Sequence, residues 1–191
     1  MRGHSLLFVF VASSICVPAT DADWIGKTQV YYTIDKARGA LFKDSEKVQE
    51  TRIELDEKAA RAIETRLKEK LACREITFYE GEKNGRSTGY ALVLDEIGKF
   101  RPITFMIRIS PEGKFENAVV MVYRECRGSE IRSKRFIRQF RGKRSAHPIR
   151  INKDVINITG ATMSVVAMTK VVRRALVLVE EAILENQNGP S

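Results

Sequence analysis

Four strand-like segments follow one another in the middle of this chain, and they limit the possible folds more than any other feature. They are "EITFYEG", "GYALVLDEIG", "ITFMIRIS" and "FENAVVMVYRE", at residues 75–81, 89–98, 103–110 and 115–125. In the third, apolar Ile103, Phe105 and Ile107 alternate with more polar neighbours, which predicts a half-buried strand. "SPEGK" joins the last two and reads as a hairpin turn in which Gly113 takes a positive φ.

Segments with helical periodicity lie on both sides of these strands. Asp56 is expected to cap a helix at residues 56–71, whose apolar stripe is Leu55, Ala59, Ile63, Leu67 and Leu71. A basic helix is predicted at residues 129–140, stopped by Gly142. The last helix is predicted at residues 162–185, with the stripe Val165, Met168, Val172, Ala175, Val179 and Ile183.

The length and composition of the chain fit one domain. It has 191 residues, of which 43% are hydrophobic, enough for one well-buried core. Before residue 56 we expect an irregular opening with a short helix and a short strand. The predicted fold class is α+β: a single domain with an antiparallel-rich sheet flanked by helices, including a long C-terminal helix.

Residues 1–22 have the layout of a secretory signal peptide. A basic start is followed by an apolar run at residues 6–17 and by small residues near Ala19 and Ala22. We therefore expect an exported protein, periplasmic or otherwise extracytoplasmic, with a mature domain at residues 23–191. An uncleaved leader would make it membrane-associated.

After removal of the leader, Cys73 and Cys126 are the remaining cysteines. In an oxidising compartment they could form one disulfide or remain two free thiols. His4 and His147 cannot build a metal site between them, so no metal is expected.

Positive charge is concentrated in residues 131–153. This window holds no acidic residue and nine basic ones: Arg132, Lys134, Arg135, Arg138, Arg141, Lys143, Arg144, Arg150 and Lys153. Such a stripe can bind nucleic acid, an acidic membrane surface, an acidic protein or a phosphorylated ligand, or it can simply be solvated. Export argues against nucleic acid. We expect some of Arg138, Arg141, Lys143 and Arg144 to lie near a cofactor or a docking face.

The stretch "DVINITGATMSVV" places several hydroxyl groups around one glycine where the last helix begins. Gly160 and Ala161 allow a close approach, and Thr159, Thr162 and Ser164 supply hydroxyls. Free N–H groups and the positive end of the helix dipole favour an anion there, which suggests a phosphate site. A helix N-cap with a spare hydroxyl would give a similar pattern.

"ITGATMS" resembles the S/T-G-A-T-x-S/T motif of the FMN-binding domain family. That family includes the extracytoplasmic flavin subunits of the Rnf and sodium-pumping NADH:quinone oxidoreductase complexes. The segments "EKNGRSTGYALVLDEIGKFRPITFMIRISPEGKFENAVVMVYRE", "YRECRGSEIRSKRFIRQFRGK" and "TKVVRRALVLVEEAI" are also similar to the family's strands, basic segment and final helix. The resemblance covers roughly residues 39–185.

The resemblance implies that Thr162 carries FMN through a phosphoester bond made by a flavin transferase. The surrounding cofactor-binding residues would be Thr159, Gly160, Ala161, Met163, Ser164, Tyr123, Glu125, Gly128 and Phe140. Glu125 and Gly128 match the family's E-x-x-G corner, although a surface ion pair with a neighbouring arginine is the alternative for Glu125. Stacking surfaces for the flavin could come from Tyr90, Phe105, Tyr123 or Phe140.

One position departs from the membrane-complex subunits, which have an aspartate three residues before the motif's first hydroxyl. Here that position is Ile156, with Asp154 the nearest acid. The chain is therefore more similar to stand-alone members, and FMN held without a covalent bond is an alternative. The expected function is electron transfer between redox partner proteins. A non-covalent FMN-dependent reductase and a non-redox basic binding module are the alternatives; no GxGxxG nicotinamide fingerprint is present.

Overall fold

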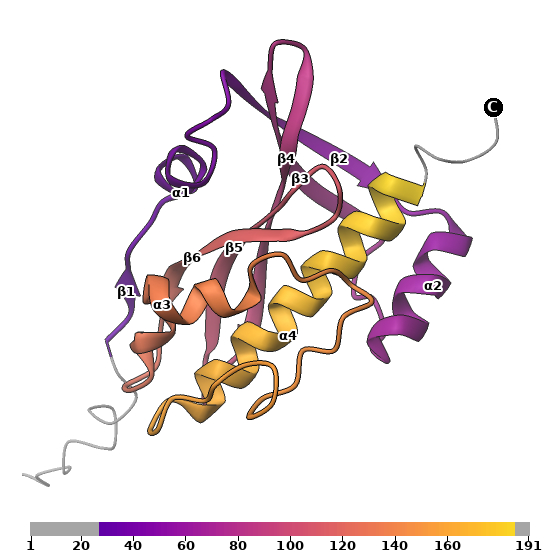
Figure 1. The fold of residues 1–191 in the computed structure, drawn as a ribbon. Helices are drawn as coiled ribbons and strands as arrows, with labels where there is room; N and C mark the ends of the chain where they lie inside the picture. Colours follow the sequence, from indigo (N-terminus) through magenta and orange to yellow (C-terminus); the bar gives the residue numbers. More distant parts are fainter. Residues whose placement is uncertain (1–26, 186–191) are drawn as a thin grey trace, which may run out of the picture.

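The structure is a computed structural model that describes residues 27–185. One antiparallel sheet forms its centre, with α4 and α2 packed on one face and α1 on the other (Figure 1). This confirms the predicted α+β class, the flanking helices and the long C-terminal helix. The predicted signal peptide at residues 1–22 lies outside the described residues. Within residues 27–185, no helix is both long and apolar enough to span a membrane.

The sheet has six strands in the order β1-β6-β5-β4-β3-β2. The elements, in chain order, are β1 (Gln29–Val30), α1 (Ile34–Leu41), β2 (Lys47–Glu54), α2 (Glu57–Leu67), β3 (Glu75–Lys83), β4 (Arg86–Ile97), β5 (Pro102–Ile109), β6 (Phe115–Tyr123), the 3-10 turn η1 (Ser129–Arg132), α3 (Lys134–Ile137), the 3-10 turn η2 (Arg138–Phe140), α4 (Thr162–Val179) and the π-helical turn η3 (Glu180–Leu184). The predicted turn after β5 is present, and Gly113 has a φ of 76°.

The prediction that residues 103–110 are half-buried is wrong, because β5 is buried on both faces. Phe105 and Ile107 face the main core under α4. Met106 faces a second, smaller core that α1 closes with Ala37 and Leu41. A helix far away in the sequence therefore covers the face that the alternating pattern assigned to solvent.

Two predicted helices have different limits in the structure. α2 ends at Leu67, not Leu71, because Lys68 takes a left-handed conformation with a φ of 58°. The basic segment at residues 129–140 is not one helix. Ser133 is extended and divides it into η1 and the α3–η2 run, where its hydroxyl caps α3. Gly142 follows with a φ of 75°, as expected for a residue that stops the helix.

Cys73 and Cys126 are free thiols, and both are exposed. Of the two alternatives that the sequence left open, the structure therefore has the free pair.

The Asp56 cap should contribute measurably to stability. Asp56 Oδ1 accepts a hydrogen bond from the Ala59 N–H at 2.7 Å. We expect Asp56→Ala to lower the free energy of unfolding by about 1 kcal/mol, measured by urea denaturation. Asp35→Ala is the matched control, because Asp35 also lies in a first helical turn but makes only an exposed ion pair with Arg38 at 3.6 Å. The cap assignment fails if both variants lose the same amount.

Candidate functional site

Three segments that are distant in sequence meet at one end of the sheet and enclose a pocket of about 710 Å³. Lys99 and Phe100 come from the turn between β4 and β5. Residues 125–127 follow β6, and residues 160–164 form the entry into α4. The pocket therefore brings together most of the "TGATMS" stretch with the E-x-x-G corner predicted beside it.

The N-terminus of α4 opens on this pocket without a side-chain cap. Ala161 is the N-cap residue, and within residues 27–185 no side chain caps the first N–H groups of the helix. Gly160 precedes it with a φ of 83°, a conformation that suits glycine. The alternative of a hydroxyl N-cap is therefore wrong. The free N–H groups and the helix dipole remain directed at whatever occupies the pocket.

The three hydroxyls of the stretch have different surroundings. Thr162 is exposed at the pocket, and its Oγ1 accepts a hydrogen bond from Asn157 Nδ2 at 3.2 Å. Ser164 is 2% exposed, and its Oγ lies 2.9 Å from the Tyr123 hydroxyl. Thr159 is exposed and lines a neighbouring cavity beside Phe136. Among residues 159–164, Thr162 alone presents an exposed hydroxyl to the pocket.

Tyr123 and Gly128 fix the junction between β6 and α4. The Tyr123 hydroxyl donates to the carbonyl of Arg127 and contacts Ser164. Gly128 has a φ of 101°, and a Cβ there would collide with Ser164 Oγ and lie 2.8 Å from the Tyr123 hydroxyl. Only glycine fits this contact. Tyr123 is 1% exposed, so it supports the pocket from below and offers no stacking surface.

Glu125 is not in a surface ion pair, so that alternative is wrong. Its side chain is 7% exposed, and Oε1 accepts the N–H groups of Phe100 at 2.6 Å and Arg101 at 2.8 Å. These bonds hold the β4–β5 turn, which places Lys99 and Phe100 at the rim of the pocket. Lys99 Nζ lies 4.8 Å from the centre of the Phe100 ring.

The other predicted stacking residues lie in the core. Phe140 is fully buried and packs against Phe115 and Phe136, with ring centroids 5.7 and 5.6 Å away. Tyr90 and Phe105 are also buried in the core. None of the three lines the pocket.

Sequence reasoning missed Lys99, Phe100, Cys126, Arg127 and Asn157. All five lie in loops; Asn157 closely precedes α4 in the chain, and only the fold brings the other four to the α4 N-terminus. The one available signal was their position beside motif residues: Cys126 and Arg127 lie inside the E-x-x-G corner.

The basic window contributes no residue to this pocket. Arg138 and Arg141 line a different cavity, beside α1. Arg144 donates to the carbonyl of Glu112 at 2.6 Å. The cations at the pocket are Lys99 and Arg127 instead.

Residues 98–177 match the sequence model of the FMN-binding domain family. The match spans β5, β6 and most of α4, with the whole pocket between them. The crystal structure of NqrC from Shewanella oneidensis is similar to this chain with 16% identity over 78% of this chain and 85% of that one, at a TM-score of 0.49. No curated protein matches the chain. Residues 98–177 therefore resemble an FMN-binding domain, which confirms the expected resemblance and FMN as the expected cofactor.

Gly128→Ala should destabilise the protein through the junction beneath the pocket. The added Cβ would meet Ser164 and Tyr123 at a positive φ. We expect a loss of about 2–4 kcal/mol in the free energy of unfolding, from backbone strain and overpacking together. Gly142→Ala is the control: its φ is also positive, but nothing lies within 4 Å of its Cβ. Its loss should stay near 1–2 kcal/mol, and equal losses would contradict the close contact at Gly128.

Burial raises the pKa of Tyr123 to about 12, against about 10 in an unfolded chain. Because the folded state holds the proton more tightly, this contribution to stability is complete below pH 10 and is lost as the pH rises toward 12. The free energy of unfolding, measured in urea between pH 9 and 12, should therefore fall more steeply with pH for the wild type than for Tyr123→Phe. Parallel curves would show that Tyr123 does not titrate in this way.

Proposed function

We propose that this protein is an exported electron-transfer flavoprotein whose FMN is esterified to Thr162. The observation that carries the proposal is the exposed Thr162 hydroxyl at an uncapped helix N-terminus inside the FMN-binding domain. Export rests on the leader-like residues 1–22. The proposed partners are a flavin transferase and redox partner proteins, at the membrane surface if the leader stays uncleaved.

The residues around Thr162 fit a flavin phosphate. The first N–H groups of α4 are free of side-chain caps, and helix N-termini of this kind bind phosphate. Lys99 and Arg127 add two positive charges to the pocket rim. The volume of about 710 Å³ lies within the range of roughly 300–1,000 Å³ that is usual for ligand pockets.

Thr162 is also arranged to act as the attachment point. Asn157 donates a hydrogen bond to Oγ1 and so orients the oxygen, while the hydroxyl proton stays available to leave. In the ester-forming step, Oγ1 would lose its proton and bond to the phosphorus of the flavin nucleotide, while one other P–O bond breaks and its oxygen departs as the protonated leaving group. Ser164 cannot take this role, because its hydroxyl is buried against Tyr123.

The rim residues suit an apolar ring that must exchange electrons with another protein. Phe100 is 49% exposed and Met163 is 45% exposed, and both line the pocket. Bound FMN would supply the redox chemistry, while the chain provides position and solvent access. Because the sequence has no nicotinamide fingerprint, we favour electron transfer over a reductase with its own substrate.

Thr162→Val should abolish covalent flavin and keep the fold. The valine preserves the shape of the side chain and removes only the oxygen that would form the ester. Co-expression with a flavin transferase followed by intact-mass spectrometry should give wild-type protein heavier by one FMN and Thr162→Val at its unmodified mass. Thr159→Val is the control within the motif, and it should reduce attachment without eliminating it. A Thr162→Val protein that still gains one FMN would place the bond elsewhere.

The Ile156 position gives a test of transferase recognition. Ile156 is 74% exposed, so a polar residue there should not disturb the core. If the missing aspartate limits recognition, Ile156→Asp should increase the flavinylated fraction in the same mass measurement. If wild type and Ile156→Asp both stay unmodified beside an active transferase, FMN is bound without a covalent bond.

A further inference from the structure

One edge of the sheet is left open beside the basic segment. β1 pairs with β6 at Val122 and Tyr123, and the N–H groups of Tyr31 and Tyr32 donate to the Met121 carbonyl. At the other end of β6, Phe115 bonds to the backbone of Gly142 and Lys143. Between these points, no described strand lies beside residues 116–120. The Ala118 N–H bonds instead to Asn117 Oδ1 at 2.9 Å, a local side-chain bond of the kind that substitutes for a missing backbone partner.

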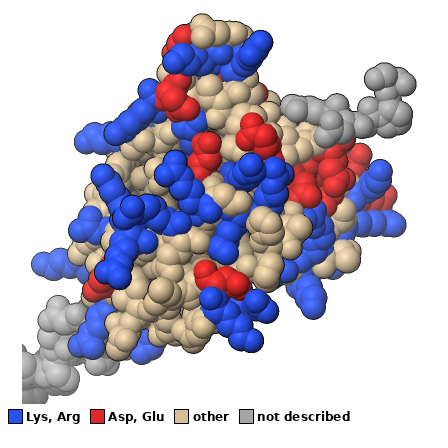
Figure 2. Space-filling view, in the orientation of Figure 1, with Lys and Arg blue, Asp and Glu red and all other residues tan. Residues whose placement is uncertain are grey.

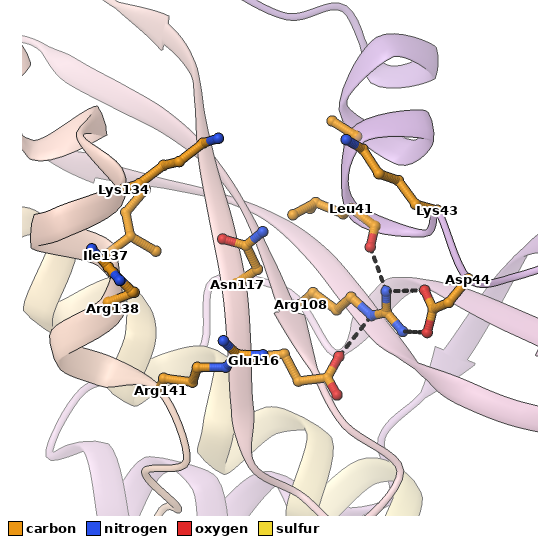
Figure 3. Close-up of a pocket in the computed structure, with 11 residues that line it drawn as sticks. Leu41, Lys43, Asp44, Arg108, Glu116, Asn117, Lys134, Ile137, Arg138 and Arg141 are labelled. Carbon is orange, nitrogen blue, oxygen red and sulfur yellow. Dashed lines mark hydrogen bonds and ion pairs between the residues drawn. The ribbon is translucent and has the colours of Figure 1, made fainter.

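This open edge lies in a groove between α1 and α3. Two adjoining cavities of about 440 and 600 Å³ share Ala40, Lys43, Asn117, Lys134 and Ile137. Figure 3 shows Lys43 on the α1 side and Lys134 on the α3 side, with Asn117 between them. Two helices thus form the walls of the groove, and the edge of β6 lies in it.

The groove carries unbalanced positive charge. Lys43, Lys134, Arg138 and Arg141 line it, and within residues 27–185 none of the four has a carboxylate within 4 Å. The two acids in the wall are already engaged: Arg108 pairs with Asp44 at 2.6 Å and with Glu116 at 2.9 Å (Figure 3). Figure 2 shows Lys and Arg side chains gathered around α3 on this side of the molecule.

The groove is separate from the flavin pocket. Asn117 lies six residues from Tyr123 along β6, which is about 20 Å of extended strand. No residue lines both the groove and the pocket at Thr162.

We propose that this groove binds an extended acidic segment of a partner protein, which adds to the sheet as a strand along residues 116–120 of β6. An open strand edge recognises the backbone of an extended chain, and the cations on both walls select acidic side chains. A second copy of this chain would bring the same cations against one another, so like-charge repulsion disfavours it. A small phosphate would use the cations but would not need the edge.

A fluorescein-labelled peptide of alternating glutamate and valine, long enough to span residues 116–120, tests the proposal by fluorescence anisotropy. It should bind the wild-type protein. The same peptide with alternate backbone nitrogens methylated should lose about tenfold or more in affinity, because it cannot donate along the edge. On hydrogen exchange, those amides of residues 116–120 that face away from β5 should become protected when the unmodified peptide binds.

The α3 segment provides a matched pair of charge variants. Lys134→Glu should weaken peptide binding by about tenfold or more, because Lys134 lines both cavities of the groove. Arg135→Glu makes a similar change on the same short helix, but Arg135 lines the cavity beside Ile156. It should change the affinity less than about twofold, and the assay needs no flavin.

Three results would overturn the proposal. The first is that the unmodified peptide does not bind. The second is that the methylated peptide binds as tightly as the unmodified one, which would indicate a charged surface without strand addition. The third is that inorganic pyrophosphate displaces the peptide far better than chloride does at equal ionic strength, which would indicate a small-anion site.

Discussion

The hydrogen bond between Tyr123 and Ser164 joins the end of β6 to the start of α4, and the functional pocket depends on it. Together with the packing of α4 on β4 and β5, this link fixes the N-terminus of α4 relative to the β4–β5 turn. Gly128 allows the two elements to come close enough, because any Cβ there would push Ser164 away. The bond also occupies one hydroxyl of the motif and leaves that of Thr162 exposed.

The charged groups of the molecule are either buried, where they hold the structure together, or exposed, where they can meet a ligand or a partner. Glu125 is buried, and its carboxylate bonds backbone N–H groups of the turn at the pocket. Arg108 is buried under the groove, where it neutralises Asp44 and Glu116. The charges of both buried groups are therefore satisfied within the protein, as the cost of burying an unpaired charge requires. The exposed lysines and arginines around them are then free to meet a ligand or a partner.

Sequence patterns predicted the features that depend on neighbouring residues. They did not predict the features that form where distant segments meet. The strands and the Asp56 cap were predictable, because periodicity and capping are local. The second buried face of β5 was not, since it requires α1, which lies far away in the chain. The motif located Thr162, but the role of Ser164 depends on Tyr123, 41 residues earlier. Lys99 and Phe100 reach the pocket only through the bonds that Glu125 makes to their turn.

If the groove binds the acidic tail of a redox partner as proposed, its wide spacing along β6 from the pocket at Thr162 has a kinetic consequence. A partner tethered by an acidic tail in the groove would keep its own redox centre near the flavin without covering it. Tethering of this kind converts a second encounter into an intramolecular one, with an effective concentration that short flexible linkers can raise to about the millimolar range. Electron exchange would then depend on the length of the linker between tail and redox centre, and much less on the concentration of the partner.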